Sequence, residues 1–158
     1  MKRIITIKNL YIFIFLLSLF SILSALYIEY VLGAIPCKLC IYQRIPYIIS
    51  IFISFVGYNY FKNDKILFLI IITFLFSVLI SGYHYGIENN IFEEFSGCTG
   101  NSLEIVDKTE LLNSLNENVA SCKDAIFKLF GMSLAGINFM LSLLIIVYSF
   151  LTLFYEKN

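Results

Sequence analysis

Four long apolar stretches constrain this chain more than any other feature. They cover residues 10–28, 45–61, 66–83 and 132–155, and each holds 17 to 24 residues. A helix of about this length crosses roughly 30 Å of hydrocarbon, at about 1.5 Å per residue. Because hydrocarbon offers no water to an unpaired backbone, the stretches are predicted to form a helical bundle. The sequence therefore predicts an all-α membrane protein, with residues 1–158 forming one integral membrane domain.

The composition supports this class and excludes others. Hydrophobic residues make up 59% of the chain and charged residues only 14%, which is too few to cover the surface of a soluble domain of this length. The lipid bilayer is therefore a predicted partner. The formal net charge is zero, which argues against nucleic acid as a partner. Small polar residues inside the stretches suit close packing of helices in lipid: Ser18, Ser21, Ser24, Ser54, Ser77 and Ser142.

The first stretch has a second interpretation. It follows the basic segment "MKRIITIKNL", as the apolar core of a cleaved signal peptide would. Its apolar core is longer than the roughly 7–15 residues typical of such a peptide, which favours a membrane anchor.

The distribution of charge predicts the orientation of the four spans. The connection over residues 84–131 carries eight acidic residues against three lysines. The two termini and the turn between the second and third spans together carry six basic residues against two acidic ones, Asp64 and Glu156; the basic residues are Lys2, Arg3, Lys8, Lys62, Lys65 and Lys157. The positive-inside rule therefore places both termini in the cytoplasm and residues 29–44 and 84–131 outside. In a bacterial inner membrane these two outward loops would face the periplasm.

All four cysteines, Cys37, Cys40, Cys98 and Cys122, fall in the two outward loops. An even number of cysteines confined to one face indicates disulfides and an oxidising compartment.

The first pair lies in the segment "IPCKLCIYQR" and forms a C-x-x-C motif. Cys40 is expected at the start of the second span, where the helix dipole favours a thiolate, and Arg44 would add a positive charge on the same face. Pro46 is expected in the first turn of that helix, where proline is tolerated. The alternatives are a stabilising disulfide or a metal site for the motif, and a headgroup contact for Arg44. The position at the membrane surface favours redox chemistry with a lipid-soluble acceptor.

The second pair, Cys98 and Cys122, lies in the long outer loop. A bridge between them would close about 25 residues and contribute roughly 3 kcal/mol, so a purely structural disulfide is the alternative here. Small residues in "FSGCTGNS" leave Cys98 accessible to a visiting protein, whereas Ala125 to Phe130 have the spacing of a short interfacial helix. Such a helix would hold Cys122 near the first pair, and the two pairs would form a relay.

Three segments resemble the disulfide bond formation protein B family, DsbB. They are "PCKLCIYQR" at residues 36–44, "GYHYGIE" at 82–88 and "FGMSLAGINF" at 130–139. The resemblance extends over about residues 10–155. It implies a four-helix quinone reductase that reoxidises a periplasmic, thioredoxin-fold protein of the DsbA type.

The resemblance also implies roles for individual residues. Cys98 would be attacked by the partner's thiolate, Cys37 would form an inter-loop bridge with Cys122, and Cys40 would be the thiolate that faces the quinone. The quinone, ubiquinone or menaquinone, would be bound with the help of Arg44. The second motif segment adds His84 and Glu88 as candidate quinone contacts, for which packing at the end of a span is the alternative.

Two other functions are compatible with part of this pattern. Four cysteines could bind zinc in a membrane metal carrier, but Cys98 and Cys122 are too far apart in sequence for a second C-x-x-C motif, so no metal site is predicted. A small structural subunit with two inert bridges is the other alternative.

Overall fold

Each of the four apolar stretches lies largely within one long helix. The computed structural model describes residues 2–60, 64–93, 122–123, 128–129 and 131–157. The four helices are α1 (Lys2–Tyr30), α2 (Lys38–Asn59), α3 (Asp64–Glu88) and α5 (Leu134–Lys157). All four contain a segment long and apolar enough to cross a membrane. The predicted all-α, four-helix membrane architecture is confirmed.

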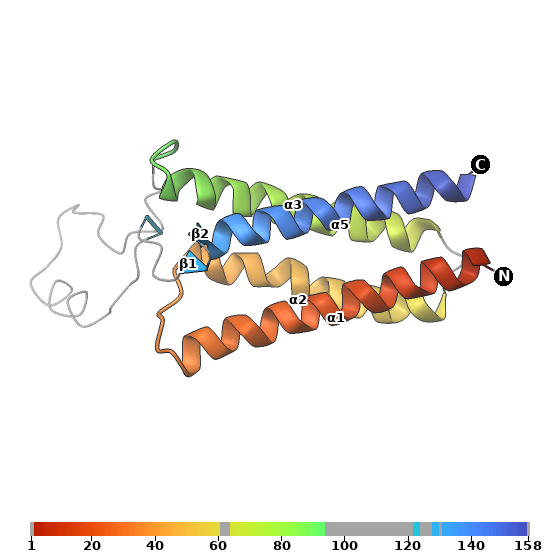
Figure 1. Ribbon diagram of the computed structural model, residues 1–158, viewed down its shortest axis with the longest axis horizontal. Coiled ribbons are helices and arrows are strands. Elements are labelled where there is room, and N and C mark those ends of the chain that lie inside the picture. The colour runs from red at the N-terminus through yellow and green to blue at the C-terminus, as the bar shows by residue number, and fades with distance from the viewer. Residues whose placement is uncertain (1, 61–63, 94–121, 124–127, 130, 158) are drawn as a thin grey trace, which may run out of the picture.

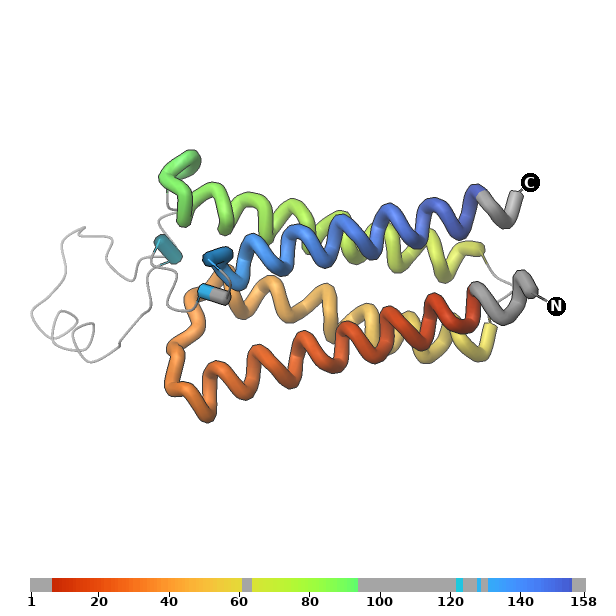
Figure 2. The backbone as a smooth tube through the Cα atoms, in the orientation of Figure 1, coloured from red at the N-terminus to blue at the C-terminus, as the bar shows by residue number. Residues whose placement is uncertain are grey.

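The helices run side by side along the long axis of the molecule (Figure 1). The two chain ends lie together at one end of the bundle, and the α1–α2 connection lies at the other end with the described residues between α3 and α5 (Figure 2). Helix α1 packs chiefly against α2, and α3 packs against both α2 and α5. This arrangement brings the described residues of the two predicted outward loops to the same end of the bundle.

All four helices extend beyond the predicted apolar stretches, and in α2 and α3 the extension includes candidate site residues. Helix α2 begins at Lys38 rather than residue 45, so Pro46 lies well inside the helix and its expected place in the first turn was wrong. Helix α3 continues to Glu88, so His84 and Glu88 belong to its last two turns and not to a loop. The sequence prediction stopped at the first polar residues, whereas Gln43 and His84 are buried against other polar groups and do not end their helices.

The segment before α5 contains a short hairpin. Strand β1 (Lys128–Leu129) pairs antiparallel with β2 (Met132–Ser133), and Gly131 adopts a positive φ of 83° in the turn. The interfacial helix predicted over residues 125–130 is therefore wrong at 128–129, and Ala125, Ile126 and Phe130 lie outside the described residues. The hairpin also explains why α5 begins at Leu134, two residues after the predicted residue 132.

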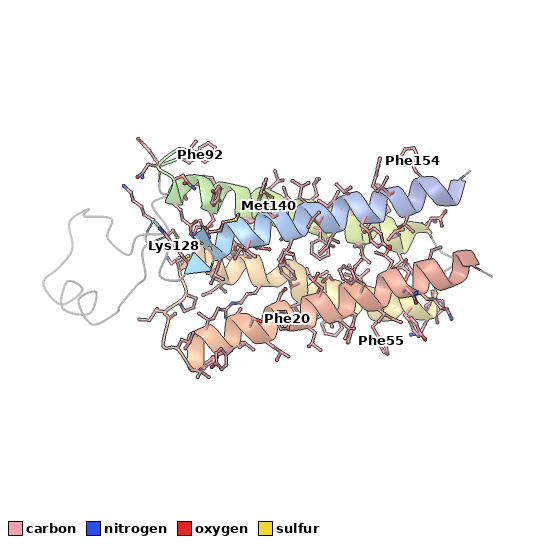
Figure 3. All side chains as sticks on the ribbon, viewed as in Figure 1. Phe20, Phe55, Phe92, Lys128, Met140 and Phe154 are labelled. Carbon is pink, nitrogen blue, oxygen red and sulfur yellow. The ribbon has the colours of Figure 1, made fainter. Side chains whose placement is uncertain are left out.

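Small polar side chains occupy much of the bundle interior. The hydroxyl oxygens of Ser18 on α1 and Ser50 on α2 lie 2.6 Å apart, and those of Ser77 on α3 and Ser142 on α5 lie 2.8 Å apart. Bulky apolar side chains cover the outside instead, among them Phe20, Phe55 and Phe154 (Figure 3). In lipid this distribution is favourable, because small residues allow close helix packing and the large ones face the hydrocarbon.

Gly57 on α2 lies directly against the ring of Tyr11 on α1, and it provides a test of this packing. A methyl group at Gly57 would overlap the ring of Tyr11, which is fully buried. We expect Gly57→Ala to lower the free energy of unfolding by about 1–3 kcal/mol, as overpacking does. Denaturation of the detergent-solubilised protein, followed by loss of helical signal, would measure it. Phe55→Leu, on the exposed face of the same helix, serves as the control, and equal stability of both variants would contradict the close approach.

Candidate functional site

The C-x-x-C motif forms the beginning of α2. Cys37 is the N-cap residue, with φ −71° and ψ 167°, and its sulfur accepts a hydrogen bond from the backbone N–H of Cys40 at 3.3 Å. N-capping by a side chain satisfies one of the unpaired donors of a helix start. The Cys37 thiol also donates to the Cys40 sulfur at 3.0 Å. The local helix geometry therefore brings the two sulfurs into contact, with Cys37 buried and Cys40 partly exposed.

The environment of Cys37 keeps this thiol protonated. Its hydrogen bond to Cys40 and its burial raise the pKa of Cys37 to about 12, against an opposing contribution from His84. At neutral pH the free Cys37 thiol is therefore the proton donor of the pair, and Cys40 is the acceptor.

This pKa leads to a prediction for the reduced protein. The rate of Cys37 alkylation by iodoacetamide should rise about tenfold per pH unit between about pH 7 and pH 10 without a plateau, because only the thiolate reacts. Peptide mass spectrometry would measure it. In Cys40→Ser the thiolate acceptor is gone, so the rate at Cys37 should level off at lower pH. A plateau below about pH 10 in the wild-type chain would disagree with the structure.

Helix α3 contributes an imidazole to the same place. His84 is 3% exposed, and its Nε2 atom lies 3.6 Å from the Cys37 sulfur and 3.7 Å from Oε1 of Glu88, one turn later. Its Nδ1 atom lies 2.9 Å from Nε2 of Gln43 on α2. The predicted residues His84 and Glu88 are thus adjacent to the C-x-x-C motif.

The fourth member of the cluster comes from the segment between α3 and α5. Cys122 is 1% exposed and packs with Cys37 and Ile87. The sulfurs of Cys37 and Cys122 and a ring nitrogen of His84 all lie within 4.8 Å of one another. Residues about 85 positions apart in the chain therefore meet at one end of the bundle. Cys98 lies outside the described residues.

The same three atoms could hold a metal ion. Two thiolates and an imidazole are ligands that zinc accepts, and a zinc ion needs a fourth ligand that this compact group does not include. The spacing of cysteines in the sequence gave no indication of the site, because the histidine comes from another helix.

Arg44 lies one turn after Cys40 on α2. Its guanidinium forms an ion pair with Glu29, at the end of α1, and both side chains are largely buried. The prediction that this charge lies on the same helical face as Cys40 stays a prediction, and the partner Glu29 was not foreseen from the sequence. The ion pair joins the last turn of α1 to the second turn of α2.

The prediction also missed three polar residues that continue from His84 into the bundle: Gln43, Asn138 and Tyr47. They form consecutive hydrogen bonds across α2 and α5. Their sequence signal was the presence of amide side chains within spans, where polar groups are costly unless paired.

Comparison with known proteins adds independent information. The sequence model of the family described as "Disulfide bond formation protein DsbB" matches residues 7–152. The chain is also 30% identical over 148 residues to "Uncharacterized protein RP370" of Rickettsia prowazekii (strain Madrid E), an alignment that covers 90% of this chain and 85% of the relative.

Proposed function

Because this chain belongs to the DsbB family, and is thus a membrane oxidoreductase of disulfide bond formation, we propose that it reoxidises a periplasmic DsbA-like protein and passes the electrons to a membrane quinone. The observation that carries the proposal is the cluster of Cys37, Cys40 and Cys122. The sulfurs of the C-x-x-C pair are in contact, and Cys122 lies within 4.8 Å of Cys37, so a disulfide can pass from one pair to the other with small side-chain motions.

The exchange begins with Cys98–Cys122 and Cys37–Cys40 as disulfides. A partner thiolate attacks Cys98, the Cys98–Cys122 bond breaks, and Cys122 leaves with the bonding electron pair. Cys122 attacks Cys37, the Cys37–Cys40 bond breaks, and Cys40 leaves as a thiolate. The partner's second thiolate then breaks the mixed disulfide, which releases the oxidised partner and reduced Cys98. The chain now holds two electrons, at Cys98 and Cys40.

The surroundings of Cys40 fit a quinone. Cys40 is partly exposed at the start of α2, beside the exposed apolar side chains of Ile41 and Ile45. Arg44 follows one turn later, and its guanidinium has five N–H groups, more than the Glu29 contact uses. These groups would hold a quinone carbonyl while the ring meets the Cys40 sulfur. When bound, ubiquinone or menaquinone would accept two electrons and two protons, the number that one partner dithiol gives up.

The proposed orientation places the cysteine cluster at the periplasmic face of the inner membrane and both termini in the cytoplasm. It is supported by the excess of lysine and arginine at the termini, which lie at the opposite end of the bundle from the cluster (Figure 1).

A reconstituted system tests the function. The purified chain would be placed in lipid nanodiscs with ubiquinone or menaquinone and supplied with a reduced DsbA-like protein. We expect one quinol for each partner disulfide formed and, when the quinone is omitted and oxygen is excluded, no partner oxidation beyond what the chain's own disulfides can supply. Partner thiols that stay reduced with both quinones would refute the proposal.

The compact group of Cys37, His84 and Cys122 supports one competing function, that of a metal carrier. Metal analysis of the purified protein separates the two. Stoichiometric zinc, with four free thiols after chelation, would favour the metal carrier over the oxidoreductase.

A further inference from the structure

A series of hydrogen bonds extends from the interior of the bundle to the cysteine cluster. The Tyr47 hydroxyl donates to Oδ1 of Asn138, and Nδ2 of Asn138 donates to Oε1 of Gln43 at 3.1 Å. Nε2 of Gln43 then lies 2.9 Å from Nδ1 of His84. Tyr47, Gln43 and His84 are all buried, so these bonds replace contacts that water would otherwise make.

This series of hydrogen bonds determines which ring nitrogen of His84 carries the proton. Oδ1 of Asn138 accepts a hydrogen bond from the Tyr47 hydroxyl and a second, at 3.3 Å, from the Ser142 hydroxyl. Because the oxygen faces these two hydroxyls, the amide nitrogen of Asn138 faces Gln43. Gln43 therefore presents its own amide nitrogen to Nδ1 of His84. An amide nitrogen only donates, so Nδ1 must accept, and the proton of the neutral imidazole is on Nε2.

On the other side of the ring, a sulfur and a carboxylate oxygen face Nε2, and the ring also forms a hydrogen bond to the backbone of Cys122. The sulfur is that of Cys37, at 3.6 Å, and the oxygen is Oε1 of Glu88, at 3.7 Å. Cys37 in turn donates to Cys40 at 3.0 Å. Every donor in the series thus points the same way, from Tyr47 through the two amides, the imidazole and the Cys37 thiol to the Cys40 sulfur.

We propose that Gln43, oriented by Asn138 and Tyr47, is a positioning residue that fixes His84 as the Nε2–H tautomer, so that a one-way series of donors ends on the sulfur of Cys40. Aligned hydrogen bonds in a poorly solvated interior polarise one another, and charge on the final acceptor gains most from this alignment. The catalytic consequence rests on the proposed function, in which Cys40 becomes a thiolate. The tautomer itself is a property of the reduced protein alone.

The chain contains a single histidine, which makes the tautomer directly measurable. In ¹⁵N-histidine-labelled, reduced protein in lipid, at alkaline pH where imidazole is neutral, the protonated and unprotonated ring nitrogens give separate signals. We expect Nε2 to carry the proton. A proton on Nδ1 would overturn the proposal, because it would mean that the donors point in the opposite direction. Equal amounts of the two tautomers would also overturn it, because Gln43 would then not fix the tautomer.

Substitutions at Gln43 then test the cause. Gln43→Met keeps the approximate shape but cannot donate, so we expect a mixture of tautomers and alkylation of Cys40 about tenfold slower at fixed pH, the effect of roughly one lost buried hydrogen bond. Gln43→Glu offers a carboxylate where the amide donates, so we expect Nδ1 to be protonated. Ser81→Ala is the matched control, because Ser81 is buried on α3 but bonds only to the backbone in its recorded contacts.

The outcomes separate this proposal from the proposed function. An unchanged tautomer and an unchanged alkylation rate in folded Gln43→Met would remove Gln43 as a positioning residue, whatever the turnover with quinone. If the variant fails to fold, the wild-type spectrum alone decides. Conversely, an Nε2–H spectrum in a protein that oxidises no partner would keep the tautomer assignment and refute only the function.

Discussion

Replacing Cys40 by serine is expected to reduce quinone-linked oxidation of the partner to the background rate. Serine cannot form a disulfide with Cys37, and its hydroxyl does not ionise near neutral pH, so it can neither leave from Cys37 nor carry electrons onward. The two sulfurs are in contact at 3.0 Å, and no other described cysteine lies on α2 to replace Cys40. The reconstituted assay, followed by quinol absorbance, measures the loss.

A matched control distinguishes a chemical role from a structural one. Ser54 is also on α2 and is buried, and its hydroxyl has no hydrogen-bond partner among the described residues. Ser54→Ala should therefore fold and turn over normally. If Cys40→Ser retained full turnover beside this control, the cysteine pairs would be inert bridges and the chain a structural subunit.

The helices could be predicted from the sequence because every span that crosses lipid needs a sufficiently long apolar run of residues. The residues at which the helices begin and end could not be predicted in this way. Gln43 and Arg44 resemble the boundary of a span, yet Gln43 is bonded to His84 and Arg44 to Glu29, so α2 passes through both. A polar residue ends an apolar stretch in the sequence, but α2 continues through Gln43 and Arg44, each of which has a polar partner on another helix.

The site shows the same division. The C-x-x-C motif is local, and its contact follows from helix geometry at spacing i, i+3. The approach of His84 and Cys122 depends on how α3 and the following segment fold back onto α2, which no spacing encodes. The family resemblance named these residues as candidates. The series from Tyr47 to His84 was found only in the structure, because it joins three helices, α2, α5 and α3, through side chains that mostly lie outside any motif.

The second large effect concerns the bridge between the two outward segments. In a chain that keeps only Cys37 and Cys122, through Cys40→Ser and Cys98→Ser, mild oxidation is expected to convert nearly all molecules to the Cys37–Cys122 disulfide. Their sulfurs lie within 4.8 Å, and both side chains are buried in one cluster. A disulfide needs a sulfur separation of about 2 Å, which rotation about the side-chain bonds of the two residues can provide. Peptide mass spectrometry without reduction would quantify the product.

The control keeps Cys40 and Cys122 instead, through Cys37→Ser and Cys98→Ser. Cys40 is not a member of the compact group around His84, so it should cross-link with Cys122 more slowly and less completely. Equal disulfide yields in the two proteins would mean that Cys122 reaches Cys37 and Cys40 equally well. The buried position of Cys122 beside Cys37 would then not determine which sulfur it attacks. The oxidation should be run with and without a chelator, because a zinc ion on Cys37, His84 and Cys122 would occupy the electron pairs that form the bridge. Bridging that requires chelation would identify a metal site, whereas bridging in both conditions makes Cys37 the sulfur through which Cys122 and Cys40 exchange electrons.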